Sequence, residues 1–214
     1  MPSGAVGSTT EVARHCAFRG LTGLALALRV PQLLNLAPTP SVPVPFNFNE
    51  NIPLRDQPPL VNTVPGAWAI DEVLERNEWV QQSGNPVSYA PHIRKQPLPA
   101  NAAKPVLMQF AKGDMTVPNP TTSAILRAGD LADRATFFRN DLAYALNNAI
   151  GRNPHTFLTN IGNPAGAPYA VGAQQQIAVF FASFGTQVID PDGSGPFFEV
   201  PITLPLPETL NYLP

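Results

Sequence analysis

KGDMTVPNP, at residues 112–120, lies between an apolar run and a helix-start pattern, and this arrangement decides the fold. The seven residues before it are almost continuously apolar, which is typical of a strand buried on both faces. After it, Asn119 can cap a helix and Pro120 can begin one over residues 121–131. Asp114 therefore lies at the carboxyl end of a predicted strand, where open α/β sheets gather their functional groups.

A second strand and a second helix follow along the chain. Residues 135–138 form a short β-prone run, and a polar segment then leads to His155. Residues 173–182 have an apolar stripe that is typical of a helix, which Gly185 stops. This alternation of strands and helices predicts the α/β class, with a mainly parallel sheet.

The composition is that of an ordered chain with few charges. Its 214 residues are enough for one domain with a real core or for two small ones. Charged residues make up 13% of the chain and the net charge is −2 without a basic cluster, which argues against nucleic acid as a partner. A single cysteine, Cys16, excludes an internal disulfide and predicts a buried, inert thiol.

Three regions are expected: a helical and proline-rich cap or loop region over residues 1–98, an α/β core over 99–185, and an extended proline-rich tail over 186–214. In the first region, one of the threonines at residues 9–10 can cap a helix. Residues 65–82 follow the 3.6-residue period of a second helix, which a proline begins.

Prolines between residues 37 and 65 exclude regular structure there. Two interpretations stay open: a surface linker, or a loop packed on the body of the protein. Phe46 and Phe48 favour the packed loop, because a solvated linker does not need aromatic side chains.

No apolar run reaches the roughly 18 residues that a membrane span needs. Residues 21–28 are apolar, but Arg29 interrupts them and no clean cleavage pattern follows, so the sequence does not indicate a signal peptide. The compartment is not predicted.

Asp114 and His155 are the residues that we interpret as carrying chemistry. A buried carboxylate that accepts a hydrogen bond from an imidazole holds its tautomer and stabilises the imidazolium, which makes the ring a useful base. The two residues are 41 positions apart, and one helix and one strand fit between them, so they can meet at neighbouring strand ends. The alternative is that Asp114 is a turn residue and His155 is satisfied locally.

The segments GDMTVP at residues 113–118 and NPHTF at residues 153–157 resemble the acid and histidine loops of bacterial lipases and esterases of the α/β-hydrolase fold. The order strand, acid, helix, strand, histidine, helix is similar to the second half of that fold. The resemblance covers the chain from about residue 9 onward, and the proline-rich region is similar to the cap of those enzymes, which are often secreted.

The resemblance implies a carboxylic-ester hydrolase without a cofactor or metal. In that family the histidine is the general base and the aspartate orients it, which implies these roles for His155 and Asp114. An apolar ester is the implied substrate, and the loop that carries Phe46 and Phe48 is expected to cover its acyl group.

The chain departs from the family at the nucleophile. That serine belongs to a G-x-S-x-G elbow that precedes the acid in the chain. No serine of this chain has glycine both two residues before it and two residues after it. The serines are Ser3, Ser8, Ser41, Ser83, Ser88, Ser123, Ser183 and Ser194. Ser183 comes nearest but follows the histidine, so we interpret it as a helix-end serine, and Ser8 as a helix N-cap.

We therefore expect that the chain begins after the elbow and that the nucleophile is not identifiable in it. The strand before Asp114 would then present an unpaired apolar edge, which predicts self-association or a complementing polypeptide. The alternative function is a catalytically incomplete or non-catalytic interaction protein that retains the second half of the hydrolase fold.

DPDGSG, at residues 190–195, begins like a calcium loop. Pro201 stands at the twelfth position, where such a loop requires glutamate, so a tight turn is the favoured interpretation. The three histidines are scattered and form no zinc-binding spacing.

Overall fold

The computed structural model describes residues 7–16, 68–203 and 205–213. The chain divides into two compact units, one made of Met1–Gly7 with Asn85–Pro214 and the other of Ser8–Gly84. The first unit combines helices with a small mixed sheet, so its fold belongs to the general α/β class.

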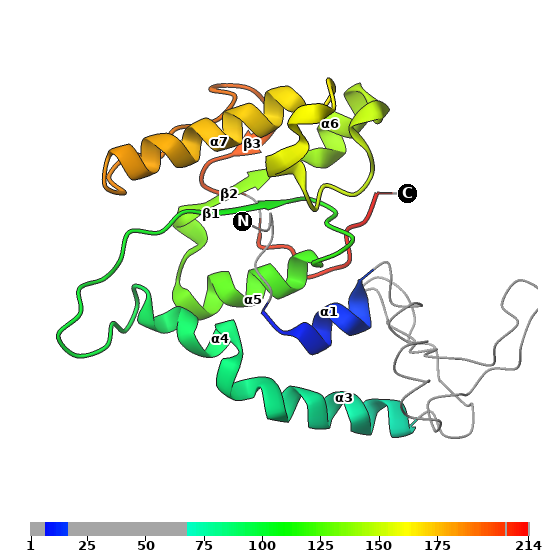
Figure 1. Cartoon of the computed structure of the whole chain (residues 1–214), viewed down its shortest axis with the longest axis vertical. Helices are drawn as coiled ribbons and strands as arrows, with labels where there is room; N and C mark the ends of the chain where they lie inside the picture. The colour runs from blue at the N-terminus through cyan, green and yellow to red at the C-terminus, as the bar shows by residue number, and fades with distance from the viewer. Residues whose placement is uncertain (1–6, 17–67, 204, 214) are drawn as a thin grey trace, which may run out of the picture. The chain divides into compact units, whose positions relative to one another are not determined.

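The sheet has three strands in the order β1-β2-β3: Met108–Ala111, Ala135–Phe138 and Phe198–Glu199 (Figure 1). β1 and β2 run parallel with Phe110 opposite Phe137, whereas β3 runs antiparallel to β2. The sheet is therefore mixed: β1 and β2 form a parallel pair as predicted, whereas the antiparallel third strand was not predicted. The third strand comes from the extended tail, which folds back and buries Phe198 beside β2.

The helices of this unit are α4 (Pro86–Tyr89), η3 (Ala90–His92), α5 (Asn119–Gly129), η4 (Ala132–Arg134), α6 (Asn140–Leu146), η5 (Asn148–Ile150), η6 (Phe157–Gly162) and α7 (Ala167–Ala182). In Figure 1, α5 lies on one face of the sheet and α7 on the other. Phe110 and Phe137 belong to the core cluster that contains residues of α5, and Ala111 and Phe138 to the cluster that contains residues of α7. Because side chains alternate along a strand, burial on both faces requires the near-continuous apolar run seen in the sequence.

Several element boundaries differ from those predicted. α5 ends at Gly129, two residues earlier than expected, because Asp130 adopts a left-handed conformation with φ of 55°. α7 begins at Ala167 instead of residue 173, and Pro168 suits its first turn. The polar segment after β2 also contains α6, which the sequence did not predict.

The second unit contains α1 (Thr9–His15), α3 (Trp68–Gln81) and η2 (Gln82–Gly84). The Ser8 hydroxyl accepts a hydrogen bond from the Glu11 amide at 3.2 Å, which confirms Ser8 as the N-cap of α1. Asn77 Nδ2 donates to Thr10 Oγ1 at 2.8 Å and joins the two α-helices. Cys16, at the end of α1, is buried as predicted.

Candidate functional site

Asp114 lies in the turn directly after β1, and its side chain is buried with 1% of its surface exposed. Its Oδ1 accepts hydrogen bonds from the amides of Thr116 at 2.9 Å and Val117 at 2.8 Å. A carboxylate that accepts N–H groups two and three residues ahead closes its own turn, which is why Asp is favoured at this position.

Asn119 closes the same loop from its far end. Its Nδ2 donates to the carbonyl of Ala111 at 2.8 Å, and its Oδ1 accepts from the amide of Gly113 at 3.0 Å. The predicted capping role of Asn119 is therefore wrong, since Pro118 is the N-cap residue and the Asn119 amide joins the strand end to the helix start. Gly113 has φ of +82°, and a Cβ there would lie 3.1 Å from the Asn211 carbonyl oxygen, so glycine suits this position.

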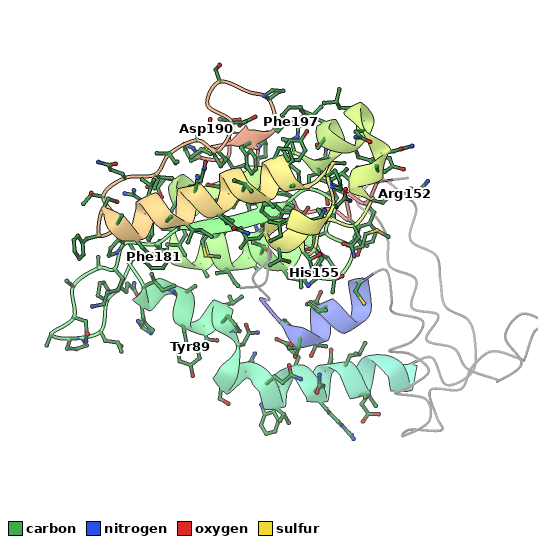
Figure 2. The ribbon with its side chains drawn as sticks, turned by 45° about the horizontal axis from the view of Figure 1, so that its top comes forward. Tyr89, Arg152, His155, Phe181, Asp190 and Phe197 are labelled. Carbon is green, nitrogen blue, oxygen red and sulfur yellow. The ribbon has the colours of Figure 1, made fainter. Side chains whose placement is uncertain are left out.

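His155 follows β2 in the chain after α6, η5 and a short loop. Asn140, at the start of α6, is buried and donates from Nδ2 to the carbonyl of Arg152 at 3.2 Å, which ties this loop to the helix. The His155 side chain, labelled in Figure 2, is 24% exposed, so the ring is partly buried and partly accessible to solvent.

The two loops meet where their side chains were predicted to meet. His155 Nδ1 lies 3.0 Å from Asp114 Oδ2 and 3.2 Å from Asp114 Oδ1. The predicted contact is confirmed, and the interpretation in which His155 is satisfied only within its own loop is wrong. The catalytic roles of the two residues stay a prediction.

The contact determines which ring nitrogen faces outward. A carboxylate can only accept, so Nδ1 must carry the proton of this hydrogen bond. Nε2 then holds the lone pair in the neutral ring, and within the described part of the chain it has no hydrogen-bond partner. This arrangement can take a proton at Nε2 while Asp114 stabilises the resulting imidazolium.

Asn153 connects the loops at a second point, and the sequence analysis gave it no role. Its Oδ1 accepts from the amides of Met115 at 3.1 Å and His155 at 3.2 Å, and its Nδ2 donates to Thr116 Oγ1 at 3.1 Å. The local signal for part of this was the Asn-Pro pair before His155, because Asn commonly accepts from the amide two residues ahead.

A network of ion pairs ties the three strands together near the site. Asp141 of α6 contacts Lys112 after β1 at 2.9 Å and Arg139 after β2 at 2.8 Å. Arg139 also reaches Glu199 of β3 at 3.1 Å. Burial works to raise the pKa of Asp141, but the hydrogen bonds from Arg139 and Lys112 outweigh it and lower this pKa to about 2.

Two other predictions concern the substrate loop and the nucleophile. Phe46 and Phe48 lie outside the described residues. No serine in the described ranges bonds to the His155 ring. Ser183 instead donates to the Phe180 carbonyl at 3.1 Å at the end of α7, as a helix-end serine does.

The turn around residues 190–195 closes on itself. Asp192 Oδ2 accepts from the Phe197 amide at 2.8 Å, and the Gly195 amide donates to the Asp192 carbonyl at 3.0 Å. Asp190 and Phe197 lie well apart from His155 in the view of Figure 2. Among the residues described, no group of three or more His, Cys, Asp or Glu side chains is arranged to hold a metal ion.

No known family model, curated protein or solved structure matches the chain. Within the part of the chain that the structure covers, no helix combines the length and the apolar character needed to cross a membrane.

Proposed function

We propose that Asp114 and His155 are the acid and the base of a carboxylic-ester hydrolase of the lipase or esterase type. The observation that carries the proposal is the 3.0 Å contact between a buried carboxylate in the turn after β1 and Nδ1 of a partly exposed histidine in the loop after η5. The order β1, Asp114, α5, β2, α6, His155, α7 supports a partial α/β-hydrolase fold, with α6 as an additional helix before the histidine. A proline-rich cap over an apolar ester is part of the same proposal.

In this mechanism His155 Nε2 removes the proton from an attacking hydroxyl and later gives it to the leaving alcohol. Asp114 accepts from Nδ1–H throughout and stabilises the imidazolium that forms between these steps. The attacking residue is not assigned. No cofactor is needed, because the proton transfers involve only the imidazole, the nucleophile and the leaving group.

The test is hydrolysis of short p-nitrophenyl esters by the wild type and by the His155→Ala and Asp114→Asn variants. We expect each substitution to lower kcat/KM by about 10³–10⁴-fold. In Asp114→Asn the new amide can donate to Nδ1, which places the ring proton on Nε2 and blocks proton acceptance there. His92→Ala is the matched control, since His92 Nδ1 contacts only the Gln96 carbonyl at 2.8 Å. Equal rates for the wild type and His155→Ala would end the proposal.

A fluorophosphonate label, followed by peptide mass spectrometry, identifies the nucleophile. We expect one residue to be labelled in the wild type and the labelling to be much slower in His155→Ala, because the attacking hydroxyl then lacks its base. Labelling at equal rates in both proteins would mean that His155 does not activate the labelled residue.

The alternative function is a non-catalytic interaction protein, and the position of β1 is the observation that favours it. β1 is an outer strand of the three-stranded sheet, and the apolar run that contains it carries no charge to discourage pairing. On this alternative the chain associates with itself or with a complementing polypeptide along β1. A compact monomer in size-exclusion chromatography with light scattering would argue against self-association.

A further inference from the structure

In the described part of the chain, the side-chain amide of Asn153 contacts both the acid loop and the backbone of His155. Its Oδ1 faces two backbone N–H groups, so this atom must be the oxygen and Nδ2 must be the donor toward Thr116. All three hydrogen bonds are therefore satisfied in only one orientation of the amide. A side chain held in one orientation by three partners is a rigid brace.

The partners of this brace are the immediate neighbours of the Asp114–His155 pair. Thr116 is held from both sides, because its amide donates to Asp114 Oδ1 at 2.9 Å and its hydroxyl accepts from Asn153 Nδ2 at 3.1 Å. Met115, the next residue after Asp114, donates its amide to Asn153. Asn153 thus links the turn that shapes the carboxylate to the backbone that carries the imidazole.

We propose that Asn153 is a positioning residue that sets the distance and angle between the Asp114 carboxylate and His155 Nδ1. The kinetic part of this inference rests on the proposed function, whereas the geometric part does not. A loss of alignment between a base and its orienting acid is costly, since displacements of about 1 Å can lower a rate about 10²-fold.

The experiment combines kinetics with proton NMR on the full chain. We expect Asn153→Ala to lower kcat about 10²-fold with little change in KM, because the brace acts on the base and not on the substrate. We also expect the downfield Nδ1–H resonance of His155, assigned by its loss in His155→Gln, to broaden or disappear. Asn163→Ala is the matched control: Asn163 also joins separate segments, donating to the Ala149 carbonyl at 2.8 Å and accepting from the Ala165 amide at 2.9 Å.

Asn153→Asp keeps the inference testable if Asn153→Ala does not fold. Its carboxylate retains the two accepted bonds, and the Thr116 hydroxyl can turn to donate to it. We expect this variant to keep the Nδ1–H resonance, because the two accepted hydrogen bonds that join the loops are retained.

The outcomes separate this inference from the proposed function. A wild type without esterase activity would overturn the hydrolase proposal. If Asn153→Ala nevertheless removed the Nδ1–H resonance, the positioning role would still be supported. An Nδ1–H resonance and a kcat that stay unchanged in a folded Asn153→Ala would overturn the positioning role. Loss of the Nδ1–H resonance in a folded Asn153→Asp, which retains the two accepted bonds, would also overturn it.

Discussion

Asp114 and Asp192 both accept hydrogen bonds from backbone amides that follow them in the chain, but one meets an imidazole and the other a second acid. Each accepts a backbone amide a few residues ahead, from Val117 in one turn at 2.8 Å and from Phe197 in the other at 2.8 Å. Beyond its turn, Asp114 contacts the imidazole of His155. Asp192 instead acts on the carboxyl group of Asp190 and raises its pKa.

The neighbour across space decides what each carboxylate can do. Burial and the Asp192 carboxyl raise the pKa of Asp190 to about 6. Asp192 Oδ1 is the one buried side-chain oxygen or nitrogen of the described structure without a hydrogen-bond partner. Turn chemistry therefore places each carboxylate, while the group that it meets decides its role: Asp114 meets an imidazole 41 positions away, and Asp192 meets a second acid two positions away.

The largest effect is expected where the carboxylate has the most partners. Asp114→Ala removes the acceptor of the Thr116 and Val117 amides and the partner of His155. Leaving buried donors unpaired costs about 1–3 kcal/mol each, so we expect a loss of about 2–4 kcal/mol in the free energy of unfolding. Urea denaturation followed by circular dichroism measures it. Asp114→Asn is the control, since it retains one acceptor oxygen, and a loss below about 1 kcal/mol in Asp114→Ala would contradict the comparison.

A smaller effect is expected for a carboxylate between two cations. The pKa of Asp141 is about 2, below its ordinary value of 3.8, so the folded state favours the ionised form. This stabilisation is present above about pH 4 and is lost as the pH falls toward 2. Because the group is partly exposed, we expect Asp141→Asn to cost about 1 kcal/mol at pH 7 and nearly nothing at pH 2. Chemical denaturation at the two pH values checks this, and an equal loss at both would contradict it.

The smallest effect, with the opposite sign, is expected for the pair of acids. The pKa of Asp190 lies above its ordinary value, so the folded state binds more protons and loses stability as the pH rises from about 4 to about 6. Asp192→Asn removes the like charge, and its amide can donate to Asp190. We expect the variant to gain up to about 1 kcal/mol over the wild type at pH 7 and to match it near pH 4. Thermal unfolding across this range tests it; a variant less stable than the wild type at pH 7 would show that the two acids do not repel.

The sequence predicted the parts of the fold that depend on neighbouring residues. The apolar run before residue 112, the β-prone run at 135–138 and the Ser8 cap all reappear in the structure. It also indicated that Asp114 and His155 can meet, which they do. Hydrophobic period and turn chemistry are local properties, so they can be read from a few residues at a time.

Only the tertiary structure decided the partners. Gln109 interrupts the apolar run because its Nε2 donates to Gln176 Oε1 of α7 at 2.7 Å, 67 positions away. β3 pairs with β2 across 60 residues, and Asn153 reaches Met115 across 38. These contacts form only when the loops and helices bring residues far apart in the chain to within about 3 Å of each other. A pattern of neighbouring residues does not contain this information.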